Sequence, residues 1–306
     1  MRSIVFLLVL LTPLLLFGCQ EREKIVIGIL PIEDSLPIVV AKDENLFSRY
    51  GLEIEVVNFN SALERDAALM AGKVDAVITD PLAVLILRSK GYDVKIVTLC
   101  LGKKPDEGVF AILASPNSSI SGIEDLNGKE IAISSNTIIE YVTDELLSKF
   151  NVSYRKLDVK QIPIRLRMLL DNKVELATLP EPLATYAQTK GAKLIISDAM
   201  INESITQTVI VFRGDVVKRK PEKIEKFLEC YAEAVRRINT NPEKYKEDFY
   251  QLARIPKDIA KFYKIPKYPL PQKLPVEFYE RYLNWALNKK LILKPIPYES
   301  VVYDQG

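Results

Sequence analysis

The stretch that decides the fold is IVIGILPIEDSLPIVVAKDENLFSRYGLEIEVVNF, residues 25–59. The apolar run at 25–30 predicts a strand, the pattern at 36–50 a helix, Gly51 a turn and the run at 52–59 a second strand. A polar loop separates the first strand from the helix. Because helices alternate with strands in this way when they cover a mostly parallel sheet, the stretch indicates an α/β protein.

The same alternation continues outward to about residue 213 and suggests two α/β units. The first has strands at 25–30, 52–59, 75–79 and 95–99 with helices at 36–50, 61–71 and 81–90. The second has strands at 109–114, 130–134, 155–160, 175–179 and 193–197 with helices at 137–150, 164–171 and 182–190, and a strand at 207–212 closes it. After Gly214 helical patterns dominate, at 221–239, 242–252, 257–263 and 276–289, with a proline-rich loop before the last.

The composition excludes several classes of function. The chain has 306 residues, a net charge of +2 and no long basic run, so we expect no nucleic-acid partner. It has no histidine, which removes Ser-His and Cys-His nucleophile pairs and imidazole metal sites. We therefore expect no catalytic residue, no metal and no cofactor. Cys100 and Cys230 are expected to be small buried side chains, although one disulfide is possible.

Residues 1–18 read as a targeting segment, with Arg2 followed by an apolar run that is too short to span a bilayer comfortably. The run ends in Leu-Phe-Gly-Cys at 16–19, which resembles the cleavage box of bacterial lipoproteins, although Phe17 is large for its position. Cleavage before Cys19 would leave a lipidated cysteine and a tether at 19–23. A plain secretory leader or an anchor is the alternative.

The order of the segments carries a family resemblance. Residues 25–59, ALERDAALMAGKVDAVITD at 62–80, GVFAILASPNSSISGIEDLNGKEIAISSNTIIEYVTDELL at 108–147 and EPLATYAQTKGAKLI at 181–195 together resemble solute-binding proteins of ABC importers, in the branch for nitrate, sulfonates, taurine and thiamine-pyrimidine precursors. The resemblance implies the type II periplasmic-binding fold, whose two α/β lobes are joined by two crossing strands, here 109–114 and 208–212. Lobe 1 would comprise residues 24–108, lobe 2 residues 109–213, and residues 214–306 would complete lobe 1 with a helical tail.

Candidate ligand-binding residues are those that follow each strand, since ligands bind beyond the carboxyl ends of strands in open α/β sheets. They are Glu33, Asp34, Asn60, Ser61, Asp80, Ser115, Ser134, Ser135, Asn136, Thr137, Glu181 and Gln207. Ser61 and Thr137 also fit capping boxes of their own helices, as does Ser121. The four carboxylates would favour a solute that carries donors or positive charge over a bare anion.

These features predict a lipid-anchored, extracytoplasmic, monomeric receptor that closes around a small solute and delivers it to an ABC permease with its ATPase. The alternatives are a ligand-sensing surface lipoprotein and an enzyme on the same scaffold. The branch resembles pyrimidine synthases that consume an active-site histidine, and that chemistry is impossible in a chain without histidine. The sequence leaves the identity of the solute open.

Overall fold

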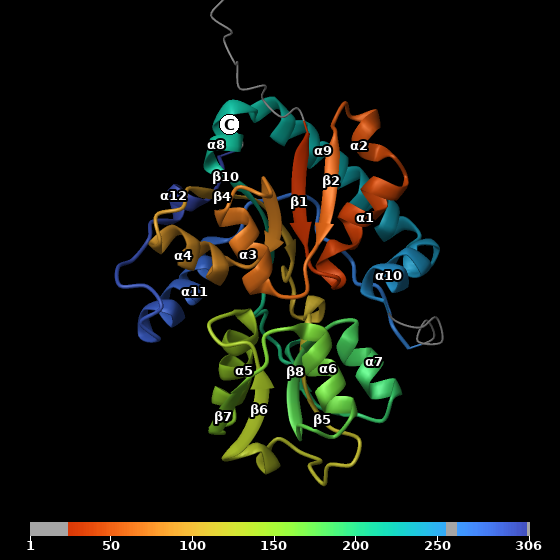
Figure 1. Cartoon of the computed structure of the whole chain (residues 1–306), viewed down its shortest axis with the longest axis vertical. Coiled ribbons are helices and arrows are strands. Elements are labelled where there is room, and N and C mark those ends of the chain that lie inside the picture. The colour runs from red at the N-terminus through yellow and green to blue at the C-terminus, as the bar shows by residue number, and fades with distance from the viewer. Residues whose placement is uncertain (1–23, 255–261, 305–306) are drawn as a thin grey trace, which may run out of the picture.

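The computed structural model describes residues 24–254 and 262–304. The molecule consists of two lobes, one above the other in Figure 1, and each is built on a five-stranded sheet. In each sheet four strands run in one direction, and the strand next to one edge is antiparallel to its two neighbours. This arrangement is the two-lobed α/β fold that the sequence predicts.

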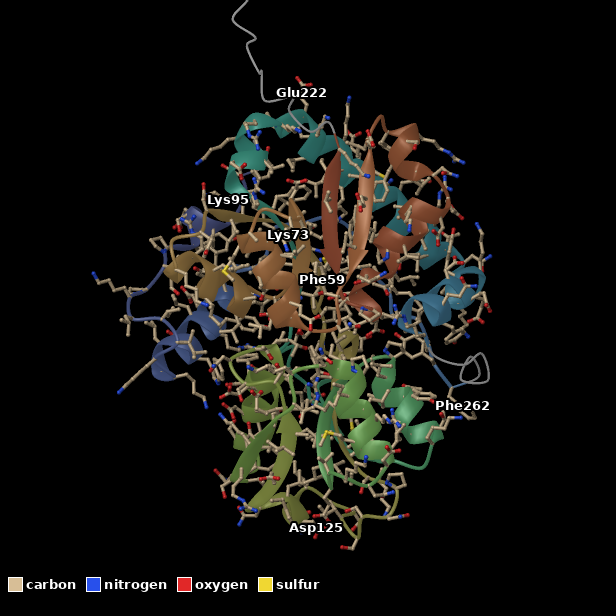
Figure 2. All side chains as sticks on the ribbon, viewed as in Figure 1. Phe59, Lys73, Lys95, Asp125, Glu222 and Phe262 are labelled. Atoms are coloured by element: carbon tan, nitrogen blue, oxygen red, sulfur yellow. The ribbon has the colours of Figure 1, made fainter. Side chains whose placement is uncertain are left out.

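Lobe 1 contains the sheet β2-β1-β3-β10-β4. Its strands are β1 (Ile25–Ile29), β2 (Ile54–Asn58), β3 (Ala76–Thr79), β4 (Val94–Leu101) and β10 (Thr208–Arg213). Strand β1 is parallel to β2 and β3, whereas β10 is antiparallel to β3 and β4. The carboxyl ends of β1, β2 and β3 point toward lobe 2, and Phe59 after β2 lies near the junction of the lobes (Figure 2).

Lobe 2 contains the sheet β7-β6-β8-β5-β9. Its strands are β5 (Phe110–Ala114), β6 (Lys129–Ile133), β7 (Tyr154–Asp158), β8 (Leu176–Pro180) and β9 (Lys193–Ser197). Strand β6 is parallel to β7 and β8, and β5 is antiparallel to β8 and β9. The chain crosses between the lobes from β4 to β5 and again from β9 to β10. The strand expected at 207–212 to close the second unit, within the range 109–213 given to lobe 2, needs correction: β10 pairs with β3 and β4 in the sheet of lobe 1.

Helices cover both sheets. Lobe 1 carries α1 (Leu36–Asp43), α2 (Leu46–Arg49), α3 (Ala62–Met70), α4 (Pro81–Ser89), α8 (Gly214–Arg219), α9 (Pro221–Thr240), α10 (Lys246–Ala253), α11 (Val276–Asn288) and α12 (Tyr298–Val301). Lobe 2 carries α5 (Ile138–Ser148), α6 (Ile162–Leu170) and α7 (Leu183–Thr189). Short 3₁₀ turns are η1 (Glu33–Ser35), η2 (Pro105–Glu107), η3 (Glu124–Leu126), η4 (Asp198–Met200) and η5 (Pro242–Tyr245).

Three local predictions need correction. The helix expected at 36–50 is two helices, because Asn45 adopts a left-handed φ of 54° between them. The capping box at Ser121 does not form: Asp125, rather than Glu124, accepts the amides of Ser121 and Gly122 at 2.9 and 3.1 Å. The segment at 242–252 begins as a 3₁₀ turn before α10, since Pro242 starts it.

Some predictions lie outside the described residues. These are the targeting segment 1–18, the tether with Cys19, and residues 257–261 of the helix expected at 257–263. In residues 24–254 and 262–304, no helix is both long and apolar enough to cross a membrane. Cys100 and Cys230 are both buried and unpaired, as expected of core side chains.

The lobes touch each other along the mouth of the cleft. The amide of Ile162 in lobe 2 donates to the carbonyl of Asn60 in lobe 1 at 3.3 Å, and Gln161 Nε2 donates to Glu64 Oε1 at 3.0 Å. Further along the cleft the amide of Glu33 donates to the carbonyl of Glu181 at 3.2 Å. What lies between these contacts is therefore largely enclosed.

Candidate functional site

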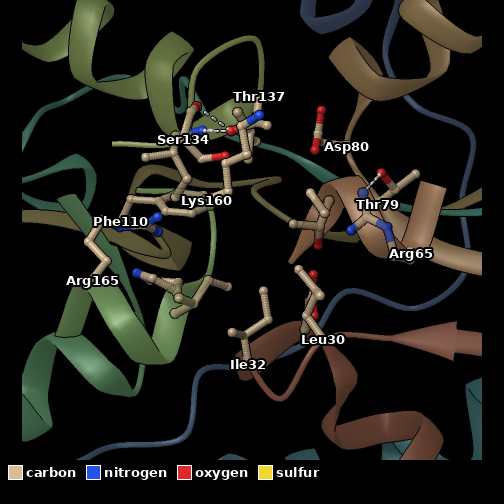
Figure 3. Close-up of a pocket in the computed structure, with 17 residues that line it drawn as sticks. Leu30, Ile32, Arg65, Thr79, Asp80, Phe110, Ser134, Thr137, Lys160 and Arg165 are labelled. Carbon is tan, nitrogen blue, oxygen red and sulfur yellow. Dashed lines mark hydrogen bonds between the residues drawn. The ribbon is translucent and has the colours of Figure 1, made fainter. Parts of the chain in front are cut away.

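A cavity of about 40 Å³ lies between the two lobes (Figure 3). Lobe 1 supplies the residues after β1, the start of α3, the end of β3 and the start of β10, whereas lobe 2 supplies the turn before α5, the face of α6 and the end of β8. The polar and charged lining residues are Asp34, Arg65, Thr79, Asp80, Ser134, Thr137, Lys160, Arg165 and Thr208. The site is thus at the carboxyl ends of the parallel strands, where α/β sheets bind ligands.

Arg165 is the most unusual group in the cavity. It lies on the buried face of α6 with Ile162 and Leu169, and it is 0% exposed. Its Nε donates to the carbonyl of Thr178 at 2.8 Å and its Nη1 to that of Val159 at 2.7 Å, while its Nη2 has no hydrogen-bond partner in residues 24–254 and 262–304. Among the described residues no carboxylate forms an ion pair with it. Burial lowers the pKa of Arg165 to about 10.

A buried guanidinium without an ion-paired carboxylate is costly, because burial removes its hydration and the carbonyls of Thr178 and Val159 replace only part of it. Proteins usually pair such a group with an acid or place it where a ligand completes the pairing. The free Nη2 of Arg165, together with its position on the cavity wall, therefore indicates a place for an anionic or strongly accepting atom. Lys160, on the same wall, adds a second cation, although its Nζ also lies 3.7 Å from Asp158 Oδ2.

Arg65 reaches toward the cavity from the opposite wall (Figure 3). Its Nη2 donates to Thr79 Oγ1 at 2.6 Å and lies 2.8 Å from Asp66 Oδ1, so its charge is already compensated within lobe 1. Arg65 is 3% exposed because α3 packs this face on β3. Arg65 holds the end of β3 in place, and its charge is better compensated than that of Arg165.

Two carboxyl groups face the cavity from lobe 1. Asp80 caps α4 by accepting the amide of Ala83 at 2.9 Å, and Asp34 accepts a hydrogen bond from Ser35 Oγ at 3.0 Å. Burial raises the pKa of Asp34 to about 7 and that of Asp80 to about 6, although Arg65 lowers both. The lobe 1 wall is thus acidic and the lobe 2 wall is basic.

The turn between β6 and α5 completes the basic wall. Thr137 caps α5 by accepting the amide of Ile139 at 3.2 Å and donates its hydroxyl to the carbonyl of Ser134 at 2.8 Å. Asn136 adopts a left-handed φ of 61°, and its amide donates to Glu140 Oε2 at 2.7 Å. The amino end of α5 therefore adds partial positive charge beside Lys160.

The structure brings six of the candidate residues named from the sequence to this region. Asp34, Asp80, Ser134 and Thr137 line the cavity itself. Ser135 and Asn136 line an adjoining pocket of about 210 Å³, which shares Asp80, Ser134, Thr137 and Lys160 with the cavity. The turn of small polar residues before α5 thus both caps its helix and faces the space between the lobes.

The other six candidates lie elsewhere. Glu33 and Glu181 line a separate pocket beside Tyr263, whose hydroxyl donates to Glu33. Burial and the Glu181 carboxylate raise the pKa of Glu33, and burial raises that of Glu181 to about 7. Ser61 caps α3 by accepting the amide of Glu64 at 3.2 Å, and Asn60 lies beside it at the rim of the cleft.

Ser115 and Gln207 do not reach the cavity. Ser115 lies at the end of the lobe 2 sheet that is remote from the cavity. Strand β5 runs antiparallel to β8, so its carboxyl end is beside the amino end of β8. Gln207 is buried in the second crossing segment, where its Nε2 donates to the carbonyl of Gly102 at 3.1 Å.

Sequence reasoning missed Arg65, Lys160 and Arg165. Lys160 comes two residues after β7, but the strand was expected to extend to residue 160, so the rule used for the other candidates passed over it. Arg65 and Arg165 each stand on the apolar face of a helix, at the spacing Arg65-Ala68-Leu69 and Ile162-Arg165-Leu169. A cation on such a face is the signal to look for, since arginine is seldom buried unless it is paired.

A family model identifies the family, and solved structures share the fold. A family model described as "NlpA lipoprotein" matches residues 25–252. A putative ABC transporter periplasmic binding protein of Brachyspira hyodysenteriae is 24% identical over 238 residues, which cover 72% of this chain and 67% of that protein.

Solved structures show the same architecture. The alkanesulfonate-binding protein SsuA of Xanthomonas axonopodis pv. citri, bound to MOPS, has a TM-score of 0.78 at 16% identity. The match covers 92% of this chain and 98% of the SsuA chain. The ligand-binding component of an ABC-type import system from Staphylococcus aureus has the same TM-score and identity and covers 92% and 97%. A mutant of DszB in complex with biphenyl-2-sulfinic acid shares the fold with a TM-score of 0.70, at 12% identity and with coverage of 93% and 97%.

Proposed function

Because the chain belongs to the NlpA lipoprotein family, we propose that it is an extracytoplasmic receptor that captures a small solute for an ABC importer. The relative from Brachyspira is described as a putative ABC transporter periplasmic binding protein. The solved neighbours from Xanthomonas and Staphylococcus are an alkanesulfonate-binding protein and the ligand-binding component of an ABC-type import system. The two lobes close on the solute, and the permease with its ATPase recognises the closed form. The protein acts as a monomer, changes no bond in its solute and needs no cofactor.

The solute carries an acidic or strongly accepting group that faces Arg165. This assignment rests on one observation, the buried Nη2 of Arg165 that lines the interlobe cavity without a partner. Ser134 and Lys160 stand on the same wall and supply a hydroxyl and an ammonium donor. Charge-assisted hydrogen bonds of this kind are about twice as strong as neutral ones, so they orient the solute.

The other end of the solute carries N–H or O–H donors that face Asp34 and Asp80. A bare anion would meet these carboxyl groups without a donor to offer them, whereas a solute with both groups satisfies both walls. The cavity has a volume of about 40 Å³, and a buried water needs ~10–15 Å³. The cavity therefore has room for about three waters, so the enclosed part of the solute is small. A longer solute extends into the adjoining pocket beside Ser135 and Asn136.

The amino-terminal segment anchors this receptor to the bacterial cell membrane, on the extracytoplasmic side. Cleavage before Cys19 and lipidation of its thiol would leave the short tether 19–23 before β1, which starts at the end of lobe 1 remote from lobe 2. One acyl chain gives only marginal membrane binding, so stable anchoring through Cys19 would require more than one chain.

A thermal-shift screen of the mature protein tests the proposal. The panel contains amino acids, aminopyrimidines, aminosulfonates, simple alkanesulfonates and nitrate. A solute at 100 times its dissociation constant adds about 2.7 kcal/mol to the free energy of unfolding, which produces a clear shift. We expect the largest shifts from compounds that carry both an acid and a donor. Chemical conversion of the best-binding compound by the purified protein would instead show an enzyme.

A further inference from the structure

Helix α11 is fixed to lobe 1 by the segments on both sides of it. Before α11, the carbonyl of Gln272 accepts the amide of Leu99 in β4 at 3.0 Å. After α11, the amide of Tyr303 donates to the carbonyl of Ile96 in β4 at 2.8 Å. The helix itself packs beside α4 (Figure 1). It therefore moves with the first sheet when the lobes separate.

From this position α11 contacts α5 of lobe 2. The ring of Tyr282 lies 4.4 Å from that of Tyr141, and the Trp285 ring meets Tyr141 edge-on at 5.5 Å. Nearer the end of the helix, Lys289 Nζ lies 2.6 Å from Asp144 Oδ2 and 3.3 Å from Glu140 Oε1. These aromatic and ionic contacts involve no residue of the interlobe cavity.

A second ionic contact lies beside the first. Arg281 Nη2 on α11 is 2.8 Å from Glu203 Oε1, and Lys149 Nζ at the end of α5 is 2.6 Å from Glu203 Oε2. Glu203 belongs to the second crossing segment, so this chain of charges joins α11, the crossing segment and α5. The contact between α11 and α5 thus extends along most of α5.

Helix α5 also carries the polar turn of the cavity. Glu140 Oε1 forms the ion pair with Lys289, and Glu140 Oε2 accepts the amide of Asn136 at 2.7 Å. Asn136 stands between Ser135 and Thr137 in the wall of the interlobe space. A movement of α5 away from α11 therefore moves the turn that faces the solute.

We infer that α11 is a latch: Tyr282, Trp285 and Lys289 are positioning residues that hold α5 in its closed place without touching the solute. The inference rests on the proposed function, since it concerns the closure that captures the solute. Contacts formed only in the closed form raise its population before any solute binds. The apparent affinity for the solute depends on that population, because it falls in proportion to the fraction of the protein that is in the closed form.

The test uses Lys289→Glu, which places a third acid beside Asp144 and Glu140. Lys129→Glu is the matched control, since it breaks the exposed pair with Glu175 within lobe 2 and changes the net charge equally. Small-angle scattering of both proteins without solute gives the radius of gyration. Calorimetry then gives the affinity for the best compound of the panel.

We expect Lys289→Glu to enlarge the unliganded protein and to weaken binding about two- to fivefold, as loss of a partly exposed ionic contact implies. The liganded radius should equal that of the wild type, and the double variant Asp144→Lys, Lys289→Glu should recover part of the affinity. An unliganded radius equal to that of the wild type, or an equal change in Lys129→Glu, would overturn the latch. The radius needs no solute, so failure of the whole panel to bind would count against the proposed function and leave this comparison intact.

Discussion

Replacement of Arg165 by Gln tests the assignment of the anionic end of the solute. The substitution removes the buried charge and the unpartnered Nη2, while the Gln amide can still donate one hydrogen bond near the carbonyl of Thr178 or of Val159. A hydrogen bond between charged groups contributes about 1.5–3 kcal/mol. The dissociation constant should therefore rise about 10- to 150-fold, because about 1.4 kcal/mol corresponds to a factor of ten.

Arg167→Gln is the control for this change. Arg167 stands two residues further along the same helix, its side chain is 83% exposed, and its Nε lies 3.5 Å from Asp171 Oδ2. Both variants should be titrated with solute by calorimetry, and their unfolding in urea without solute should be measured. We expect the control to bind as the wild type does. An affinity of Arg165→Gln within about twofold of the control, with folding intact, would refute the role of Arg165.

Three further predictions follow from the site and the amino terminus. Asp80→Asn keeps the cap of α4, since Asn caps as well as Asp, so stability should hardly change while affinity for a donor-bearing solute falls about tenfold; tighter binding in calorimetry would show that the solute is a bare anion. Burial raises the pKa of Glu181 to about 7, so the folded protein keeps a proton that the unfolded chain releases, and the free energy of unfolding should fall as pH rises from about 4 to about 7. Glu181→Gln should flatten this fall in urea titrations, and an unchanged slope would contradict the account. Cys19→Ser should move the protein from the membrane fraction to the soluble fraction and abolish labelling by a fatty-acid analogue, whereas unaltered labelling would place the lipid elsewhere.

The sequence was sufficient for the architecture because strand and helix periodicities are local properties. The strands at 25–30, 130–134 and 193–197 lie within one residue of β1, β6 and β9. Short helices were missed where no periodicity can develop, as in α8 and α12. The left-handed turn at Asn45 broke a helix whose apolar pattern continues across it.

The site was harder to predict because it depends on strand direction and on charge compensation. Ser115 follows a strand like the other candidates, yet β5 runs antiparallel to its neighbours, so its end points away from the cleft. Arg65 and Arg165 look alike in the sequence. Only the structure shows that Arg65 pairs with its chain neighbour Asp66, whereas Arg165 keeps one nitrogen without a partner among the described residues.

The expectation of an acidic cleft was therefore incomplete. Asp34 and Asp80 do line the cavity, but Lys160 and Arg165 face them from lobe 2. Glu33 and Glu181, which the sequence grouped with them, lie around a different pocket because the chain turns away at η1 and after β8. The charge of the cleft is a property of two walls that lie far apart in sequence.

The most direct test of the central claim is a crystal structure of the protein with the compound that gives the largest thermal shift. We expect that compound between the lobes, with its acidic group about 3 Å from Arg165 Nη2 and a donor facing Asp34 or Asp80. A compound bound in the pocket beside Glu33 and Tyr263, with Arg165 still unpaired, would contradict the account.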